Sequence, residues 1–238
     1  STAPMMASTT EVGQAVHNVV WHCLSQANPV KGSGIWTGSL DTAIFYGLNQ
    51  RNKKFTICNL TQVIGGGGAR NSMDGWPVAH AKAANTNLPN IEIHEAYWPV
   101  IYKFRRIVPE KDVAGSGAGT FHGGLGMELE VGPYDGPLKL QNRGNHVYHP
   151  TAGVFGGFGG HPGGMEIRDA KTGETKKKLR PKGLDYLLEP EKDSLFMRTP
   201  GGGGYGEPFK RDPGNLEEDI LEEFVSSETV EKIYGVQR

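Results

Sequence analysis

Residues 199–213 read T-P-G-G-G-G-Y-G-E-P-F-K-R-D-P. Glycine loses more backbone entropy on folding than any other residue, so four in a row weaken a helix or a strand. A folded chain keeps such a run where its backbone enters a space that no side chain can share. The tract therefore marks a close approach of backbone to another part of the molecule or to a ligand.

The glycine pattern recurs along the chain. Residues 64–70 read I-G-G-G-G-A-R, and two further stretches lie between the tetraglycines, G-S-G-A-G-T-F-H-G-G-L-G at 115–126 and G-V-F-G-G-F-G-G-H-P-G at 153–163. The chain holds 35 Gly and 15 Pro among 238 residues, below the roughly 25–30% at which such content indicates low complexity. We therefore interpret the tracts as loops around an ordered core.

Hydrophobic periodicity predicts the elements between these loops. Apolar residues at helical spacing indicate an amphipathic helix over 10–26, and alternating apolar residues indicate strands. The polar residues 49–52 predict a hairpin connection between the strands at 43–48 and 54–63. Pro99 cannot donate a backbone hydrogen bond, so its part of the stretch at 90–108 is predicted to lie at a sheet edge or bulge. The predicted segments are strands at 43–48 and 54–63, a strand-rich stretch at 90–108, a strand after 126, a hairpin at 165–179 that turns at 171–174, a helix at 215–225 and a second helix with Ser227 as its cap.

These elements predict an α+β fold. It consists predominantly of antiparallel sheets, with an N-terminal amphipathic helix, C-terminal helices and long glycine-rich loops. No linker-like segment divides the chain, so residues 1–238 are taken as a single region.

Charge and cysteine usage exclude several classes of protein. The net charge of -1 argues against a nucleic-acid or membrane-surface partner recognised by bulk electrostatics. No stretch approaches about 18 consecutive apolar residues, and the first residues lack the pattern of a signal peptide. Cys23 in the first helix and Cys58 in a strand are predicted to be buried free thiols, typical of a cytoplasmic protein.

Two familiar kinds of ligand site are disfavoured. Gly115 to Gly119 contains G-x-G patterns, but no helix is predicted after it and no Gly-Lys-Ser/Thr follows, so a phosphate loop is not supported. His146 and His149 are three residues apart, yet Gly144 and Pro150 favour a loop or strand there, and no carboxylate completes a ligand set. We expect no metal in this chain.

Three histidines lie beside turns rich in glycine or asparagine. His80, His94 and His122 are placed where a side chain facing a cavity can transfer a proton or polarise a carbonyl. A structural role, with the ring hydrogen-bonded inside the fold, is the favoured alternative for each of them. Neither cysteine has the electropositive setting of a nucleophile.

Two arginines lie close to the glycine-rich loops. A guanidinium group at Arg70 or Arg105 suits a carboxylate, a phosphate or bicarbonate. The carboxylates of Asp74, Glu92 and Glu95 are candidate partners for these arginines. A solvated or structural salt bridge is the equally favoured alternative.

Taken in order, the motifs resemble the C-terminal half of the hydantoinase B family. That family includes B subunits of N-methylhydantoinases, the matching part of ATP-dependent 5-oxoprolinase, and large subunits of acetone and acetophenone carboxylases. The resemblance is carried by I-G-G-G-G-A-R-N-S-M-D-G (64–75), N-T-N-L-P-N-I-E-I-H-E (85–95), W-P-V-I-Y-K-F-R-R (98–106), the glycine stretches at 115–126 and 153–163, T-P-G-G-G-G-Y-G-E-P (199–208), R-D-P (211–213) and V-S-S-E-T-V-E-K-I-Y-G-V (225–236).

The chain departs from the family pattern at two places. His122 stands where the family usually has arginine, and A-K-A-A-N-T-N at 81–87 replaces a segment that often reads H-M-T-N-T. Both departures predict an altered substrate pocket. The chain also begins where the second half of a full-length protein of this family would begin, which resembles the split subunits of acetophenone carboxylase.

The resemblance implies a subunit of a multi-subunit, ATP-dependent ketone carboxylase in the cytoplasm, with acetophenone converted to benzoylacetate. ATP and Mg²⁺ would bind a hydantoinase A-type ATPase subunit, and bicarbonate would be the co-substrate. The other implied partners are the complementary N-terminal hydantoinase B-type subunit, which carries the family's metal motif, and a small zinc-binding subunit. The alternatives are a subunit of an ATP-dependent cyclic amide hydrolase and a non-catalytic assembly subunit.

The resemblance also sharpens the choice of candidate site residues. A site of this kind stabilises developing oxyanions with N–H donors and guanidinium groups while it excludes water. We therefore predict catalytic roles for His122, Arg70 and His80. The predicted substrate-binding residues are Gly66, Gly67, Gly68, Arg105, Gly202 and Gly203.

Overall fold

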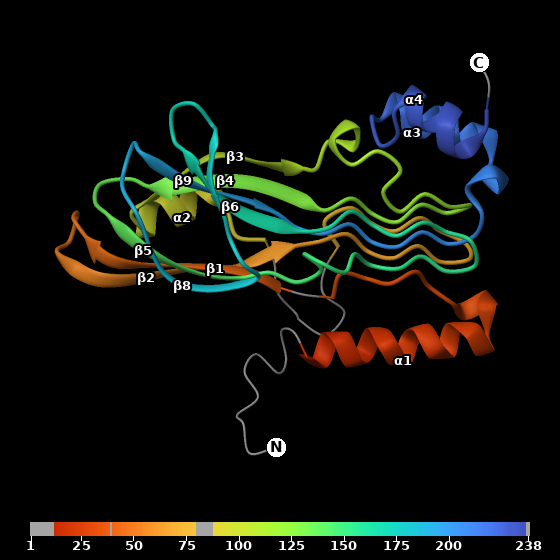
Figure 1. Cartoon of the computed structure of the whole chain (residues 1–238), viewed down its shortest axis with the longest axis horizontal. Helices are drawn as coiled ribbons and strands as arrows, with labels where there is room; N and C mark the ends of the chain where they lie inside the picture. The colour runs from red at the N-terminus through yellow and green to blue at the C-terminus, as the bar shows by residue number, and fades with distance from the viewer. Residues whose placement is uncertain (1–11, 39, 80–87, 237–238) are drawn as a thin grey trace.

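The computed structural model describes residues 12–38, 40–79 and 88–236. Two antiparallel sheets form one half of the molecule (Figure 1), which confirms the predicted fold class. One sheet has four strands in the order β2-β1-β5-β8, and the other has five in the order β3-β4-β9-β6-β7. The strands are β1 (Leu40–Asn49), β2 (Lys54–Ile64), β3 (Val100–Ile107), β4 (Met127–Pro133), β5 (Leu138–Arg143), β6 (Gly164–Asp169), β7 (Thr175–Lys178), β8 (Lys182–Leu188) and β9 (Asp193–Arg198).

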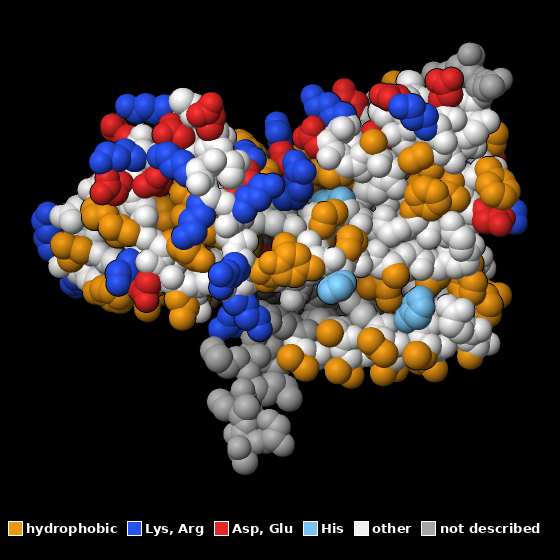
Figure 2. Space-filling model, in the orientation of Figure 1, with side chains coloured by type: hydrophobic (Ala, Val, Ile, Leu, Met, Phe, Trp, Pro, Cys, Tyr) orange, Lys and Arg blue, Asp and Glu red, His pale blue; other side chains and the backbone are white. Residues whose placement is uncertain are grey.

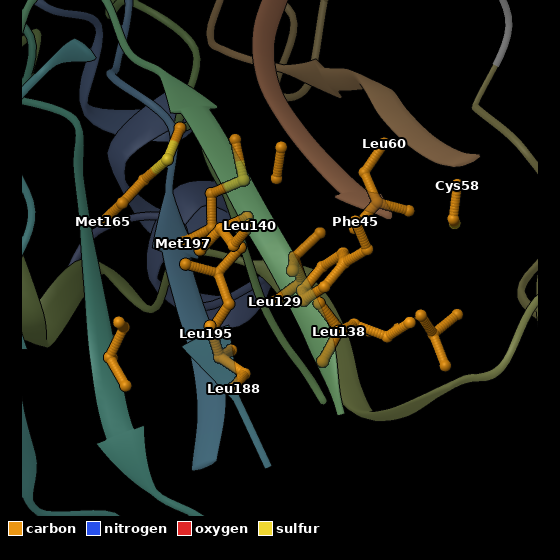
Figure 3. Packing of buried hydrophobic residues seen from close by; sticks show 14 of the residues in the cluster. Phe45, Cys58, Leu60, Leu129, Leu138, Leu140, Met165, Leu188, Leu195 and Met197 are labelled. Carbon is orange, nitrogen blue, oxygen red and sulfur yellow. The ribbon is translucent and has the colours of Figure 1, made fainter. Parts of the chain in front are cut away.

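The hydrophobic core lies between the two sheets (Figure 3). Phe45 of β1 lies opposite Cys58 of β2 and Leu140 of β5, and all three side chains are buried. The five-stranded sheet contributes the facing pair Leu129 and Met197 from β4 and β9. Alternate residues of β1, β2, β4, β5, β6 and β9 thus lie in one shared core, as period-2 patterning predicts.

Several local predictions are confirmed, and one is wrong. The hairpin of β1 and β2 and the hairpin of β6 and β7 form as expected, and β3, which follows Pro99, is an edge strand. The stretch at 90–108, predicted to be rich in strands, instead begins with a helix, α2 (Ile91–Tyr97). The side chain of Asn90 caps this helix by accepting a hydrogen bond from the Ile93 N–H at 3.1 Å, a local contact that the alternating pattern hides.

The glycine tracts form the other half of the molecule, where they run side by side as extended segments (Figure 1). Hydrogen bonds join one tract to the next: Gly66 donates to the Pro200 carbonyl at 2.9 Å, Gly202 to Gly124 at 2.8 Å, and Gly124 in turn to Gly67 at 2.8 Å. We call this arrangement the glycine bundle. It comprises residues 33–37, 64–69, 115–126, 151–161 and 199–206.

Close packing explains why the bundle needs glycine. A Cβ atom on Gly202 would overlap the carbonyl oxygen of Gly67, and a Cβ atom on Gly66 would overlap that of Gly124. Collagen uses glycine for the same reason, because only a residue without a side chain fits where extended chains meet. The tetraglycine at 201–204 is therefore enclosed by its sister tracts.

Helices lie on opposite sides of the bundle (Figure 1). On one side, α1 (Gly13–Ala27) is anchored by polar contacts, with the Asn18 amide donating to the Trp36 carbonyl at 2.8 Å. On the other side, Leu216 of α3 (Pro213–Leu221) and Tyr234 pack against Ala118 of the bundle. The remaining helical segments are α4 (Ser227–Thr229), the π-helical turn Val230–Tyr234 and the 3-10 turns Pro29–Lys31, Glu110–Asp112 and Pro208–Lys210.

Two details of the helices correct the sequence-based expectations. Cys23 is exposed, because α1 turns the side that carries it away from the bundle, while Cys58 is buried as predicted. Ser226, one residue earlier than expected, caps α4 by accepting from the Thr229 N–H at 3.2 Å. Among the described residues, no helix combines the length and the apolar character needed to cross a membrane.

Candidate functional site

His122 lies in the glycine bundle between the two tetraglycine tracts. Its carbonyl accepts a hydrogen bond from the Gly75 N–H at 2.7 Å, and its own N–H donates to Asp74 Oδ1 at 2.7 Å. Two residues on, Gly124 donates to Gly67 and accepts from Gly202. The backbone of three glycine-rich segments therefore fixes the position of this histidine.

The imidazole ring of His122 faces acceptor oxygens on both sides. Its Nε2 atom lies 3.5 Å from Asp219 Oδ1 and 3.6 Å from Asp74 Oδ2, and its Nδ1 atom lies 3.2 Å from the Gly123 carbonyl oxygen. Phe224 stacks against the ring with a centroid separation of 6.2 Å. Both ring nitrogens thus face oxygen atoms that can accept a hydrogen bond.

Arg211 joins the two carboxylates beside His122. Its Nη1 and Nη2 atoms donate to the two oxygens of Asp74 at 2.7 and 2.9 Å, and its Nε and Nη2 atoms donate to those of Asp219 at 2.7 and 2.9 Å. The guanidinium also donates to the Thr120 carbonyl at 3.2 Å. Paired N–H donors of this kind are the strongest way to hold a carboxylate.

Because the side chains of Arg211 and Asp219 are buried, each charge in this cluster is stabilised mainly by its charged neighbours. The Arg211 side chain is 1% exposed, that of Asp219 is 9% exposed and that of Asp74 is 34% exposed. Burial alone would raise the pKa of Asp219, but the hydrogen bonds and charges of His122 and Arg211 outweigh it and hold that pKa below its usual value. Burial likewise opposes the charge of Arg211, and the two carboxylates raise its pKa. Asp74 is the member of the cluster most open to an incoming ligand.

The same residues have the composition of a metal site. One ligand atom each from Asp74, His122 and Asp219 lies within 4.8 Å of the others. All four carboxylate oxygens, however, already accept hydrogen bonds from Arg211. The guanidinium thus supplies the positive charge that a cation would supply, and the donor set matches an arginine-centred network.

The two predicted arginines lie elsewhere, and the predicted pairing with Asp74 is wrong. Arg70 is exposed, with its guanidinium carbon 5.6 Å from the ring of Trp36, while Arg105 donates to the Pro89 carbonyl at 2.6 Å. Asp74 instead pairs with Arg211. Within the described residues, neither Glu92 nor Glu95 forms an ion pair with Arg70 or Arg105. Glu95 accepts a hydrogen bond from the Tyr102 N–H at 2.7 Å.

The predicted substrate-binding glycines are part of the bundle. Besides Gly66 and Gly202, whose N–H groups bond to neighbouring tracts, Gly67 donates to the Trp76 carbonyl and Gly203 to the Ile35 carbonyl. Gly68 packs against the Gly34 carbonyl. These contacts build the bundle, and the substrate-binding role of the glycines stays a prediction. His80 lies outside the described residues, so its catalytic role stays a prediction as well.

Two other histidines have structural surroundings. His94 is buried, contacts the Tyr102 hydroxyl at 2.9 Å and meets the ring of Trp98 edge-on at 4.9 Å. The ring of His146 lies between two carbonyl oxygens, those of Thr37 at 3.0 Å and His149 at 2.9 Å. These contacts fit the structural alternative for His94, and they occupy both ring nitrogens of His146.

A hollow of about 700 Å³ opens beside the bundle. Its lining includes Ser116, His161 and Arg198, and its volume lies in the range of small-molecule sites. Burial lowers the pKa of His161 to about 4, so its ring is neutral near pH 7. None of the predicted catalytic residues that the structure describes lines this hollow.

Arg211 and Asp219 are the site residues that the sequence-based reasoning missed. Arg211 belongs to the R-D-P motif at 211–213, which contributes to the family resemblance. Asp219 lies between Leu216 and Ile220 on the apolar face of its helix, where an unpaired carboxylate would be costly. A charged residue on an apolar face is the signal that points to a buried partner.

The sequence of this chain is similar to those of known proteins. The chain is 27% identical over 252 residues to the beta subunit of caprolactamase from Pseudomonas jessenii, covering 98% of the chain and 40% of that protein. It is 28% identical over 225 residues to the B-type component of a putative D-/L-hydantoinase from Pseudomonas sp. (strain NS671), covering 94% of the chain and 36% of the relative. The chain therefore spans well under half the length of these curated relatives.

Two solved structures share the fold. The crystal structure of ATP-dependent caprolactamase from Pseudomonas jessenii matches with a TM-score of 0.77 and 26% identity, covering 90% of this chain and 37% of the other. Nucleotide-free acetone carboxylase matches with a TM-score of 0.68 and 20% identity, covering 92% and 33%. The latter likeness shows the fold alone.

The family model described as hydantoinase B/oxoprolinase matches residues 1–208, which is most of the chain. Its match includes every segment of the glycine bundle, among them the one that carries His122 and the tetraglycine at 201–204. The chain belongs to the hydantoinase B/oxoprolinase family.

Proposed function

We propose that this chain is one part of a multi-subunit, ATP-dependent enzyme that hydrolyses a cyclic amide. The observation that supports this most is the likeness to ATP-dependent caprolactamase, which extends over 90% of the chain at a TM-score of 0.77. A second relative is named for the hydrolysis of another cyclic amide, hydantoin. In this proposal ATP and Mg²⁺ bind an ATPase subunit of the hydantoinase A type.

The chemistry requires both activation and proton transfer. Phosphorylation of the amide oxygen by ATP breaks amide resonance, after which water adds to the carbon and the ring nitrogen leaves. ADP is released in the first step, and the departure of nitrogen leaves an acyl phosphate. A second water hydrolyses this acyl phosphate to the ring-opened acid and inorganic phosphate. The leaving nitrogen must gain a proton, and a positioned imidazole is the commonest group for such a transfer. His122, held between Asp74 and Asp219, is our candidate proton donor.

Ketone carboxylation is the second candidate. It is favoured by the fold likeness to acetone carboxylase over 92% of the chain. In that reaction an enol phosphate, formed from acetophenone or a related ketone, would transfer its phosphoryl group to water. The enolate released would then attack CO₂ formed from activated bicarbonate. N–H and guanidinium donors that stabilise a developing oxyanion would serve either reaction. A subunit that only assembles the complex is the third possibility.

Substrate-dependent ATP turnover by the purified complex separates these functions. We expect caprolactam, hydantoin or 5-oxoproline to stimulate ATP hydrolysis without bicarbonate and to yield a ring-opened product by mass spectrometry. Acetone and acetophenone, each with bicarbonate, form the comparison set. If only a ketone with bicarbonate stimulates ATP hydrolysis, and no cyclic amide does, the chain belongs to a ketone carboxylase and the amide proposal is wrong.

A His122→Gln variant tests whether this chain takes part in the chemistry. Loss of a general acid typically lowers kcat about 10²- to 10⁴-fold, and we expect a loss in that range in a complex of normal subunit composition. His149→Gln, at an exposed histidine, is the matched control. Unchanged turnover in the assembled His122 variant would leave the chain with a structural role only.

A further inference from the structure

Helix α1 turns its apolar side away from the protein. Val16, Val19, Val20 and Leu24 are each 50–63% exposed, and the helix contains no Asp, Glu, Lys or Arg. The side that faces the bundle carries the buried polar residues Gln14, Asn18 and Ser25. A helix on a free surface has the opposite arrangement, with its apolar stripe toward the core.

The four-stranded sheet also exposes apolar side chains on its outer face, beside the exposed ion pair of Lys139 with Asp185. Leu48 lies opposite Phe55 across β1 and β2, and Ile57 follows two residues along on the same face. On the other side of β1, Leu187 of β8 lies opposite Lys139 of β5. The four apolar side chains are 45–68% exposed. An antiparallel sheet whose second face meets water normally carries polar residues there.

The outer face of the five-stranded sheet shows what a free face of this protein looks like. There the buried carboxylate of Glu128 is paired with Arg106 and Arg198, and that of Glu130 with Lys103 and Arg168. Figure 2 shows basic and acidic side chains gathered along the upper edge of the molecule, over this sheet. On the opposite sheet, exposed apolar side chains lie beside the ion pair of Lys139 with Asp185.

The two apolar surfaces lie on the same side of the molecule. Figure 1 places α1 and the four-stranded sheet along the lower side, and Figure 2 shows hydrophobic side chains along the lower edge at both. We call them together the apolar face, defined by Val16, Val19, Val20, Leu24, Leu48, Phe55, Ile57 and Leu187. Exposed apolar surface on this scale marks an interaction site.

We infer that the apolar face packs against the part of a hydantoinase B-type protein that lies outside the segment matched by this chain. The matched segment is 40% of the caprolactamase beta subunit and 37% of the caprolactamase chain of known structure, so more than half of such a protein remains to be placed. A permanent interface resembles a domain core cut in half, apolar and poor in charge. Helix α1, which is uncharged, fits that description better than it fits a transient contact.

The inference rests on the proposed function only for its choice of a B-type partner. The surface itself is defined by exposure and composition, and its occupancy is measured without ATP or substrate. A complex that fails to hydrolyse cyclic amides would therefore leave the inference intact. Equally, an active complex with this face bare would contradict the inference and not the function.

Site-specific photo-crosslinking in the intact complex tests this assignment. A benzophenone amino acid replaces Val20 on α1 or, in a second sample, Ile57 on β2, and crosslinked peptides are identified by mass spectrometry. We expect both positions to crosslink to hydantoinase B-type sequence outside the matched segment, whether it lies on the same or on a separate polypeptide. The control is Leu221 on α3, which is 83% exposed on the other side of the bundle and is expected to give no such crosslinks.

A charged double variant checks that the apolar character itself makes the contact. We expect Val16→Asp with Val20→Asp to lower the yield of the Ile57 crosslink at least tenfold, and Leu221→Asp to leave it unchanged. Far-UV circular dichroism confirms that the variants fold, since the substituted side chains are exposed. Crosslinks to a second copy of this chain or to the ATPase subunit, or no crosslinks at all, would overturn the inference.

Discussion

At the scale of single residues, Arg211 is the group on which the candidate site depends. Its side chain is almost fully buried and neutralises two carboxylates, and His122 depends on the same carboxylates for its orientation. Removing one partner of a buried ionic network leaves an uncompensated charge. The arginine therefore both stabilises the fold and sets the electrostatics around the histidine.

We predict that Arg211→Met lowers the free energy of unfolding by about 3–5 kcal/mol, because Asp219 and Asp74 lose their cation in a buried site. Urea unfolding monitored by circular dichroism measures the change. Lys232→Met is the matched control, since the ion pair of Lys232 with Glu228 is mostly exposed and screened by solvent, so little change in stability is expected. Equal losses in the two variants would show that the network contributes no more than a surface pair.

His161 provides a pH-dependent contribution to stability. Its buried ring accepts a hydrogen bond from the Gly126 N–H at Nε2, 3.2 Å away, so Nδ1 carries the proton toward the Pro162 carbonyl at 3.1 Å. With a pKa of about 4 in the folded state and 6.5 as the reference value, the unfolded chain binds more protons between these values. The contribution is therefore complete above pH 6.5 and is lost as the pH falls toward 4.

We predict a loss of about 2 kcal/mol between pH 7.5 and pH 5 from this histidine. Urea unfolding at both pH values measures it as the difference between wild type and His161→Gln, which should lack this part of the decline. His149→Gln, at an exposed position, should decline as wild type does. If the His161 variant keeps the full wild-type decline, the ring does not titrate as its burial implies.

At the scale of elements, the tetraglycine tracts act as packing elements that carry no side chains. Each takes its hydrogen bonds from tracts distant in the sequence, and neighbouring backbones fill the space where a Cβ atom would lie. Overpacking such a contact forces the backbone itself to move, which costs more than a shift of a flexible side chain.

Gly202→Ala is therefore expected to destabilise the fold by about 3 kcal/mol or more. The new methyl group would meet the Gly67 carbonyl, which is fixed by its hydrogen bond from Gly124. Gly164→Ala in β6 is the control, because no heavy atom lies within 4 Å of its added Cβ, and a change within about 0.5 kcal/mol is expected. Thermal unfolding of the two variants measures both, and similar melting temperatures would refute close packing at Gly202.

At the scale of the whole molecule, the protein has two unlike sides. The five-stranded sheet presents paired charges, whereas α1 and the four-stranded sheet present apolar side chains. The site around His122 lies in the bundle, where Arg211 joins Asp219 of α3 to Asp74 and to the Thr120 carbonyl. Assembly through the apolar face would thus leave the contacts of Arg211 with Asp74 and Asp219 unchanged.

Local sequence patterns determined a large part of this architecture. The sheet hairpins, the C-terminal helix and the loop character of the glycine tracts followed from alternation, helical spacing and turn residues, because each depends on neighbours in the sequence. His122 was chosen as a candidate from its position in a glycine-rich segment, and its catalytic role stays a prediction. The family resemblance was confirmed by the match over residues 1–208.

Only the tertiary structure decided which residues meet. Periodicity showed that helix α1 is amphipathic, but not that Asn18 and Ser25 would face the protein and Cys23 the solvent. Nothing local in the sequence joins Asp74 to Arg211, which lies 137 residues further along the chain. Such contacts depend on how distant segments pack, and here the glycine tracts bring them together because their backbones can approach without side chains between them.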